Sequence, residues 1–269
     1  MAELLRAARV LSWPLVVDGE SGLILDGSHR AVVLARELGA RFAVVQRVAL
    51  DASDVQVGSW CRVLEGVSPA AFDDARRTLR LEADCHEGLR CHYGDRVYGR
   101  SGSSASGSHE LASEIERRLS PNGHGREARL VEEEAATPWI GAAGVVVLRP
   151  PPLDKATVRR RPGGALLPLK STRFRFPYRV LGLSVPLAAL GGPREALAAE
   201  LERERARPLA CLGAGLAIDR RNPERLWQFV DHRIPDGLFA DEAGRHAYAD
   251  ALTRAAHSTE PRPDRSRQG

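Results

Sequence analysis

The sequence feature that most constrains the fold is a strand-to-helix corner between residues 23 and 39. The apolar run at residues 23–25 is short and bounded, which is typical of a buried strand. Asp26 and Gly27 interrupt it, and a glycine there allows backbone angles that other residues avoid. Apolar residues with helical spacing follow and end at Gly39, a typical C-cap residue: Val32, Val33, Leu34 and Leu38. The stretch predicts a strand, a tight turn and a helix.

The corner also carries side chains that suit anion binding. His29 and Arg30 would lie in the first helical turn, beside unpaired backbone N–H groups and the positive end of the helix dipole. A lone Asp-Gly turn usually only reverses the chain. Here a carboxylate, a glycine, an imidazole and a guanidinium gather at one corner, which favours a phosphate site.

A second polar cluster lies in an expected loop far along the chain. Lys170, Ser171, Thr172 and Arg173 supply two cations and two hydroxyls within four residues. A guanidinium can bind phosphate or carboxylate oxygens in pairs, and hydroxyl groups can fix their orientation. On its own, this tetrapeptide would be interpreted as an ordinary solvated loop.

Both segments resemble motifs of one known family. Residues 14–30 resemble the P-[IL]-[IV]-V-D-x-x-x-x-[IV]-[IL]-D-G-H-H-R segment of free serine kinases with the ParB/sulfiredoxin-like fold. Residues 167–173 are similar to that family's P-P-K-[ST]-T-R-H segment. Two separated motifs in the right order are more specific than either alone. With the strands between them they cover residues 13–190.

The resemblance implies a reaction and a set of site residues. The family phosphorylates the hydroxyl of free L-serine to O-phosphoserine, using ADP or ATP with Mg²⁺, and such a reaction belongs to a biosynthetic pathway. By this resemblance, Asp26 and His29 are catalytic and Asp26 also binds the metal. The nucleotide would be bound by Gly27, Ser28, His29 and Arg30, and the amino acid by Trp60, Lys170, Ser171, Thr172 and Arg173.

The chain departs from the family pattern at three places. Ser28 replaces the first histidine of the D-G-H-H-R motif, and Phe174 replaces the histidine after T-R. These kinases also carry a catalytic glutamate well before the motif aspartate, but only 25 residues precede Asp26 and none matches it. The group that accepts the hydroxyl proton is therefore unassigned. These departures leave two alternatives open: a kinase for another hydroxyl amino acid, or a ParB-like regulator that binds nucleotide or DNA without turnover.

The order of the expected elements predicts an α/β (α+β) fold, a ParB/sulfiredoxin-like mixed-sheet domain with additional C-terminal helices. We expect a nucleotide-binding region at 1–100, a second lobe with the K-S-T-R loop at 101–192, a helical extension at 193–256 and a disordered tail at 257–269. Helices are expected at 69–79, 109–119, 194–207, 223–231 and 240–256, a hairpin at 80–98 and a flexible joint at 101–108.

Composition narrows the possible partners and location. No apolar run approaches the roughly 20 residues that span a bilayer, and the first residues lack the layout of a secretory signal, which favours the cytoplasm and no membrane partner. The net charge of +4 permits an anionic partner. The 5% aromatic content and the lack of a helix-turn-helix pattern with a basic recognition helix argue against nucleic acid. The expected partners are a free amino acid and a nucleotide. The oligomeric state stays open.

Overall fold

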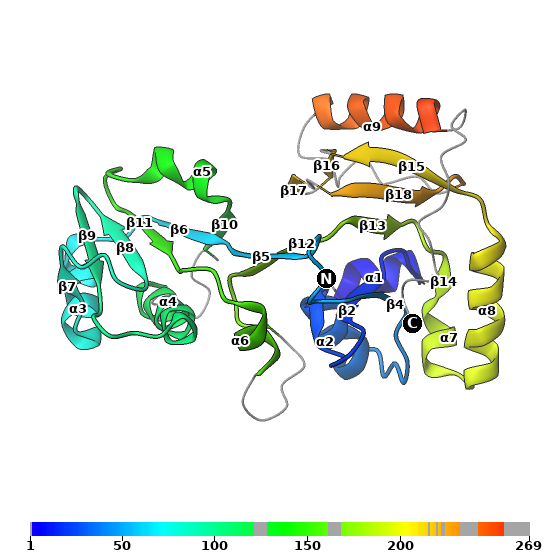
Figure 1. Ribbon diagram of the computed structural model, residues 1–269, viewed down its shortest axis with the longest axis horizontal. Helices are drawn as coiled ribbons and strands as arrows, with labels where there is room; N and C mark the ends of the chain where they lie inside the picture. The colour runs from blue at the N-terminus through cyan, green and yellow to red at the C-terminus, as the bar shows by residue number, and fades with distance from the viewer. Residues whose placement is uncertain are drawn as a thin grey trace. The chain divides into compact units, whose positions relative to one another are not determined.

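The computed structural model describes residues 2–120, 128–160, 168–214, 216–218, 220–221, 224–231 and 242–255. The chain divides into two compact units, which we describe separately (Figure 1). Unit 1 combines residues 1–56 with residues 175–269, and unit 2 comprises residues 57–174. The chain leaves unit 1 in β5 (Gln56–Ser59) and returns in β12 (Thr172–Arg175), and these two strands pair with each other.

Unit 2 is built on a six-stranded sheet in which all neighbouring strands are antiparallel. Its strands, in spatial order, are β10 (Arg129–Val131), β6 (Cys61–Glu65), β11 (Val145–Arg149), β8 (Arg90–Tyr93), β9 (Arg96–Gly99) and β7 (Glu82–Ala83). The central strands are thereby paired on both edges, which satisfies their backbone polar groups.

Helices cover both faces of this sheet, as Figure 1 shows. Helices α3 (Pro69–Leu79) and α4 (Ala105–Leu119) lie on one face, and α5 (Glu133–Ala136) with the 3₁₀ turn η1 (Thr137–Trp139) lies on the other. In β11, Val146 and Leu148 pack toward α3 and α4, while Val145 and Val147 pack toward α5. Because both faces are buried, residues 145–148 of this strand are all apolar.

The prediction of a flexible joint at 101–108 is wrong for residues 105–108, which are helical. Helix α4 begins at Ala105, and the Ser104 side chain caps it by accepting a hydrogen bond from Gly107 N. A serine oxygen can accept a hydrogen bond from a backbone N–H group of the first helical turn. A serine-rich, low-complexity segment can therefore contain the start of a helix. Ser68 caps α3 in the same way, and the expected helix at 69–79 is confirmed. The short helix α6 (Lys155–Arg159) is capped by Asp154.

Unit 1 contains two three-stranded sheets, each with one parallel and one antiparallel pairing. The first has the order β3 (Ile24–Asp26), β2 (Leu15–Asp18), β4 (Val45–Val48), and the second β13 (Tyr178–Leu181), β18 (Arg225–Phe229), β15 (Leu209–Ala214). Two small ribbons pair β1 (Val10–Leu11) with β14 (Val185–Pro186) and β16 (Ala217–Ile218) with β17 (Arg220–Arg221).

The side chain of Gln46 links the two larger sheets of unit 1. From β4, its Nε2 donates to Tyr178 O at 2.9 Å and its Oε1 accepts from Val180 N at 3.1 Å, on β13. Gln46 is buried, so these bonds are shielded from water. The Gln46 side-chain amide thus connects β4 and β13, which belong to different sheets.

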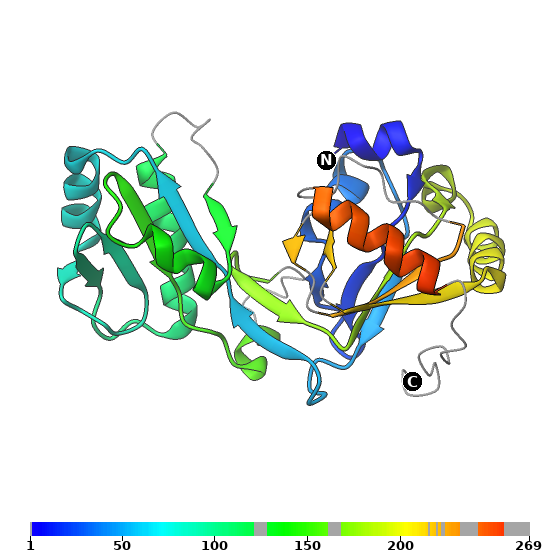
Figure 2. The ribbon, with the colours of Figure 1, turned by 90° about the horizontal axis from the view of Figure 1, so that it is seen from above.

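The helices described in unit 1 are α1 (Ala2–Ala8), α2 (Ser28–Arg36), α7 (Leu187–Gly191), α8 (Arg194–Ala206) and α9 (Glu242–Ala255). Helix α9 lies across the sheet of β18 and β15, as Figure 2 shows in orange over yellow. Its residues Tyr248, Ala251 and Ala255 share a core with Leu212 and Leu226. The architecture is the expected α+β class, with mixed sheets and packed helices.

The division of the chain differs from the one expected at residues 100 and 192. The proposed helical extension at 193–256 contains helices α8 and α9, as expected, but also strands β15 and β18, and β18 pairs with both β13 and β15. The helix expected at 223–231 is wrong, because Arg225–Phe229 is a strand at the centre of its sheet. A short apolar run does not distinguish a buried helix from a buried strand, and only distant partners decide. The tail at 257–269 lies outside the described residues.

The hairpin expected at 80–98 forms with a different turn. Strands β8 and β9 are its arms, and the turn between them contains Gly94 with a φ of 57°. Gly88, with a φ of 60°, lies before β8, and β7 pairs with β9. Of the helices that the structure describes, none has the length and apolar character needed to cross a membrane.

Leu148→Ala should show how much the core of unit 2 contributes to stability. Leu148 is 0% exposed, so the substitution removes apolar contacts and leaves a cavity, at a cost of about 2–5 kcal/mol in the free energy of unfolding. The control is Val45→Ala on β4, where the side chain is 41% exposed and the loss should be about 0.5 kcal/mol or less. Urea denaturation followed by circular dichroism measures both. Equal losses would contradict the packing described.

Candidate functional site

The strand, turn and helix expected at residues 23–39 are confirmed. Strand β3 ends at Asp26, Gly27 is the N-cap residue, and α2 begins at Ser28 with His29 and Arg30 in its first turn. Gly27 has a φ of 88°, in the left-handed region. A Cβ at this position would lie 2.7 Å from Arg30 Nη2 and from Leu15 Cδ2. Glycine is therefore required both by the backbone angle and by the close approach of Arg30.

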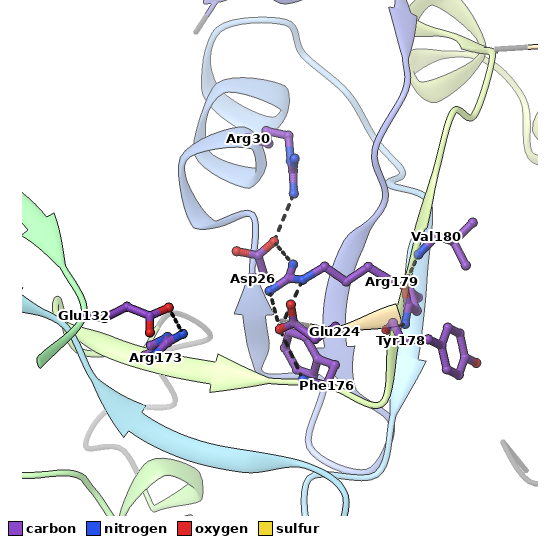
Figure 3. Close-up of polar contacts among 10 residues, drawn as sticks. Asp26, Arg30, Glu132, Arg173, Phe176, Tyr178, Arg179, Val180 and Glu224 are labelled. Carbon is purple, nitrogen blue, oxygen red and sulfur yellow. Dashed lines mark hydrogen bonds and ion pairs between the residues drawn. The ribbon is translucent and has the colours of Figure 1, made fainter. Parts of the chain in front are cut away.

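Asp26 lies between two guanidinium groups, as Figure 3 shows. Its Oδ2 accepts a hydrogen bond from Arg179 Nη1 at 2.8 Å and lies 3.5 Å from Arg30 Nη2. Arg179 also pairs with Glu224 Oε1 at 3.5 Å, and the Glu224 side chain is 3% exposed. We call Asp26, Arg30, Arg179 and Glu224 the ion-pair cluster. It joins the motif corner to β13 and to the start of β18.

Electrostatics keep Asp26 ionised. Burial raises the pKa of its carboxyl, but the nearby Arg179 and Arg30 together outweigh burial, so the pKa lies below its ordinary value. The cluster is formally neutral, with two carboxylates and two guanidiniums. Three buried atoms of the cluster have no hydrogen-bond partner within the described part of the chain: Arg30 Nε, Arg179 Nε and Glu224 Oε2. The cluster therefore has an unused donor at the helix N-terminus.

A small cavity opens beside the cluster. It has a volume of about 30 Å³ and is lined by Trp13, Pro14, Val16, Asp26, Arg30, Gln46, Arg179, Val180 and Leu181. This volume can hold a water molecule or a small polar group, not a nucleotide. Any nucleotide at this corner would have to lie mainly outside the cavity.

The K-S-T-R residues of unit 2 form a turn that leads into β12. Lys170 and Ser171 lie in the turn, and Thr172 and Arg173 begin the strand. Lys170 is half exposed and its Nζ pairs with Glu116 Oε1 at 2.6 Å. Ser171 is 3% exposed, and its hydroxyl accepts a hydrogen bond from Arg62 Nε. Phe174, which follows Arg173 and replaces the histidine of the family motif, is buried.

Trp60 contacts two residues of the second motif, Ser171 and Arg173. Its backbone N donates to Ser171 O at 2.8 Å, and the guanidinium carbon of Arg173 lies 4.7 Å from its ring centroid. Arg173 also forms an ion pair with Glu132 (Figure 3). A guanidinium stacked on an indole and paired with a carboxylate is held in a fixed orientation. Thr172 Oγ1 is buried and has no hydrogen-bond partner among the residues described.

The expected site residues thus gather in two sets. Asp26, Gly27, Ser28, His29 and Arg30 belong to unit 1, and Trp60 with residues 170–173 belongs to unit 2. Each set is assembled within its own unit. That both sets serve one phosphoryl-transfer site stays a prediction.

The structure adds residues that sequence reasoning missed. Arg179 and Glu224 have no local signal, because their partners lie 153 and 45 residues away along the chain. Glu132 was likewise unmarked in the sequence. Arg62 did leave a signal, since it is a charged residue inside the apolar strand β6. An arginine in such a strand is buried only where it is paired.

His109 lies beneath the second motif and is 1% exposed. Its Nδ1 is 3.1 Å from Lys170 O, and its Nε2 is 2.9 Å from Pro151 O and 3.5 Å from Ser59 Oγ. Burial lowers the pKa of this imidazole, opposed by the two carbonyl groups and assisted by the charge of Arg62. The folded protein therefore favours the neutral ring.

Comparison with solved structures identifies the fold. The SbnI protein of Staphylococcus aureus, truncated at its C-terminus, matches with a TM-score of 0.56 and 19% identity over 76% of this chain and 88% of that chain. A free serine kinase mutant in complex with ADP matches with a TM-score of 0.54 and 20% identity over 70% of this chain and 84% of that chain. Free serine kinase in complex with AMP gives 0.54 and 21%, over 70% and 83%.

The chain has the fold of free serine kinases. This is the fold that the two motifs implied. Neither a protein-family model nor a curated protein sequence matches the chain. At about 20% identity, the comparison establishes that the fold is shared with free serine kinases. It does not assign roles to individual residues.

Gly27→Ala and Gly39→Ala form a matched pair that tests the corner. Both glycines have positive φ, so each substitution should cost about 1 kcal/mol of stability through backbone strain. Only Gly27→Ala also displaces Arg30 and Leu15, which should add about 1 kcal/mol or more, since nothing lies within 4 Å of a Cβ at Gly39. Urea denaturation measures both losses. If they were equal, Arg30 would not be held against Gly27.

The pH dependence of stability tests the environment of His109. Its folded-state pKa is lowered, so between that value and its ordinary pKa the unfolded chain binds more protons. The His109 contribution is therefore complete above about pH 6.5 and is lost as the pH falls toward the folded-state pKa. We expect wild type to lose more stability than His109→Gln between about pH 7 and pH 5. Parallel profiles in urea denaturation would contradict the burial of a neutral imidazole.

Proposed function

We propose that this protein is a small-molecule kinase that transfers a phosphoryl group from ATP or ADP to the hydroxyl of a free amino acid. L-serine is the first candidate, with O-phosphoserine as the product of a biosynthetic step in the cytoplasm. The observation that carries the proposal is the corner at Asp26–Arg30, a helix N-terminus with two guanidiniums and one carboxylate, within a fold shared with free serine kinases solved with ADP and AMP.

The corner of unit 1 would bind the nucleotide phosphates. Backbone N–H groups of Ser28, His29 and Arg30 at the start of α2 point out of the helix and suit phosphate oxygens. Arg30 has an unused Nε donor in the structure. Arg179, which sequence reasoning did not include, supplies a second guanidinium at the same place. Phosphoryl transfer depends mainly on positioning and on charge stabilisation, which these groups can provide.

Mg²⁺ would accompany the nucleotide. In the described ranges no group of three or more His, Cys, Asp or Glu residues could hold a metal ion. Mg²⁺ at nucleotide sites is usually held by one or two carboxylates and by the phosphates themselves. The donor set at the corner fits this arrangement, with Asp26 as the protein carboxylate. When bound, the ion would offset the negative charge of the phosphates.

The second set of residues would bind the amino acid. Arg173, fixed on Trp60, is suited to the carboxylate, and Thr172 has a hydroxyl available for a further hydrogen bond. Lys170, which is half exposed, would supply a cation for the transferred phosphate. Since the Ser171 hydroxyl is bound by Arg62, we assign Ser171 to holding the turn. A loose transition state makes small demands on a general base, and Asp26 or His29 could accept the proton.

Asp26→Asn tests the proposal against a matched control. Purified protein is incubated with ATP or ADP, Mg²⁺ and a panel of free hydroxyl amino acids, and products are identified by mass spectrometry. We expect phosphoserine from wild type and a loss of about 100-fold or more in Asp26→Asn, which removes the ionised carboxylate from the site. The control is Asp73→Asn on α3, where the exposed carboxylate pairs with Arg76 only 3.3 Å away on the same helix.

The outcomes separate the alternatives. Product from another hydroxyl amino acid alone would keep the kinase and replace the substrate. No product from wild type with any acceptor, together with salt-sensitive DNA binding, would overturn the proposal in favour of a ParB-like regulator. Equal activity in wild type and Asp26→Asn would remove Asp26 from the catalytic centre.

A further inference from the structure

A buried polar cluster of unit 2 lies under the turn at Lys170 and Ser171. It consists of Arg62 on β6 and His109, Ser113 and Glu116 on α4. We propose that Arg62 and His109 are positioning residues that fix the Lys170–Ser171 peptide and thereby set the geometry of Thr172 and Arg173 for the amino-acid substrate. This inference rests on the proposed function, which assigns those residues to the substrate.

Arg62 is the centre of this cluster. Its side chain is 0% exposed, and its guanidinium donates to Glu116 Oε2 at 2.8 Å and to Ser113 Oγ at 3.1 Å. A buried ion pair is seldom more stabilising than a well-packed apolar residue of similar volume, because both charges lose their hydration. The burial of Arg62 is therefore better explained by what its remaining donors hold.

Those remaining donors reach the second motif. Arg62 Nε donates to Ser171 Oγ, and Nη2 donates to Lys170 O at 3.1 Å. His109 Nδ1 lies 3.1 Å from the same Lys170 O. On the other side, Trp60 N donates to Ser171 O at 2.8 Å. The turn is thus held at three atoms: the carbonyl oxygens of Lys170 and Ser171, and the hydroxyl oxygen of Ser171.

The backbone at Ser171 shows why such holding is needed. Its φ is 78°, in the left-handed region that residues other than glycine rarely adopt. A conformation of this kind costs free energy and persists only when several contacts impose it, which is common at functional sites. The chain turns here and then enters β12 with Thr172 and Arg173. Their directions depend on the angle at Ser171.

The contrast between neighbouring hydroxyls supports this division of roles. Ser171 Oγ is used by Arg62, whereas Thr172 Oγ1, one residue later, has no hydrogen-bond partner in the described portions of the chain. Arg173 is fixed on Trp60, the residue whose N–H also holds Ser171. Ser171 is therefore devoted to anchoring, while Thr172 keeps a hydroxyl that is not used for anchoring.

Arg62→Met and Ser171→Gly test the inference, with Arg117→Met as the control. Arg62→Met fills the buried volume but removes all donors. Ser171→Gly removes the hydroxyl anchor and relieves the strain, so it keeps the protein folded if Arg62→Met does not. Arg117 lies on the same helix α4 and pairs with Glu114 at the surface, so the control makes the same change without touching the cluster. Arg62→Lys and His109→Gln keep part of the contacts.

The expected result is local. Amide hydrogen exchange at residues 170–173 should rise about tenfold or more in Arg62→Met and Ser171→Gly, less in Arg62→Lys and His109→Gln, and not in Arg117→Met. The ratio kcat/KM for the amino acid should fall about 100-fold in Arg62→Met, with partial recovery in Arg62→Lys, because small displacements of positioning groups are costly. The Kd for ADP should stay within about twofold of wild type, since the nucleotide contacts proposed at residues 27–30 lie in unit 1.

Unchanged exchange at residues 170–173 in both variants would overturn the inference. So would a loss of kcat/KM matched by an equal loss of ADP affinity and a large fall in Tm, because that pattern indicates general destabilisation. The exchange measurement needs no substrate. An inactive wild type would therefore defeat the proposed function, while the exchange data would still decide whether Arg62 and His109 hold the turn.

Discussion

The contact on which unit 1 depends is the ion pair between Asp26 and Arg179. It joins residues 153 positions apart at 2.8 Å, and Gln46 adds two hydrogen bonds from β4 to β13 beside it. Unit 1 is assembled from the two ends of the chain, so local structure cannot hold it together. The carboxylate that ends the motif strand therefore has a structural role, and any ligand that binds Asp26 must compete with two guanidiniums.

Unit 2 also has a charged side chain that binds several partners, but its central charge is positive. In unit 1 a partly exposed carboxylate receives two arginines, whereas in unit 2 a fully buried arginine binds a carboxylate, two serines and a carbonyl. In both units the charge fixes a backbone segment that carries candidate site residues. Rigid presentation of a few polar groups is what phosphoryl transfer requires, because the chemistry itself demands little of the protein.

Local signals in the sequence were sufficient for some elements and insufficient for others. The helix at Pro69–Leu79 was predictable because Ser68 and Pro69 mark its start, and the corner at Gly27 was predictable because strand, turn and helix are contiguous. Strand β18 was mistaken for a helix, since its pairing with β13 and β15 is not encoded locally. The two motifs marked most candidate residues, and Arg62 left a signal as a charged residue in an apolar strand, but Arg179 became visible only once its distant partner Asp26 was placed.

The discontinuous construction of unit 1 has a consequence for biosynthesis. Unit 2 is one continuous stretch and can fold as soon as residue 174 has left the ribosome. The first 56 residues must wait for the rest of unit 1, because β13, β15, β18 and α9 are all translated after unit 2 and the partner of Asp26 arrives only at position 179. During that interval β3, β2 and β4 can pair with one another, but Asp26 lacks Arg179 and Gln46 lacks its two backbone partners on β13.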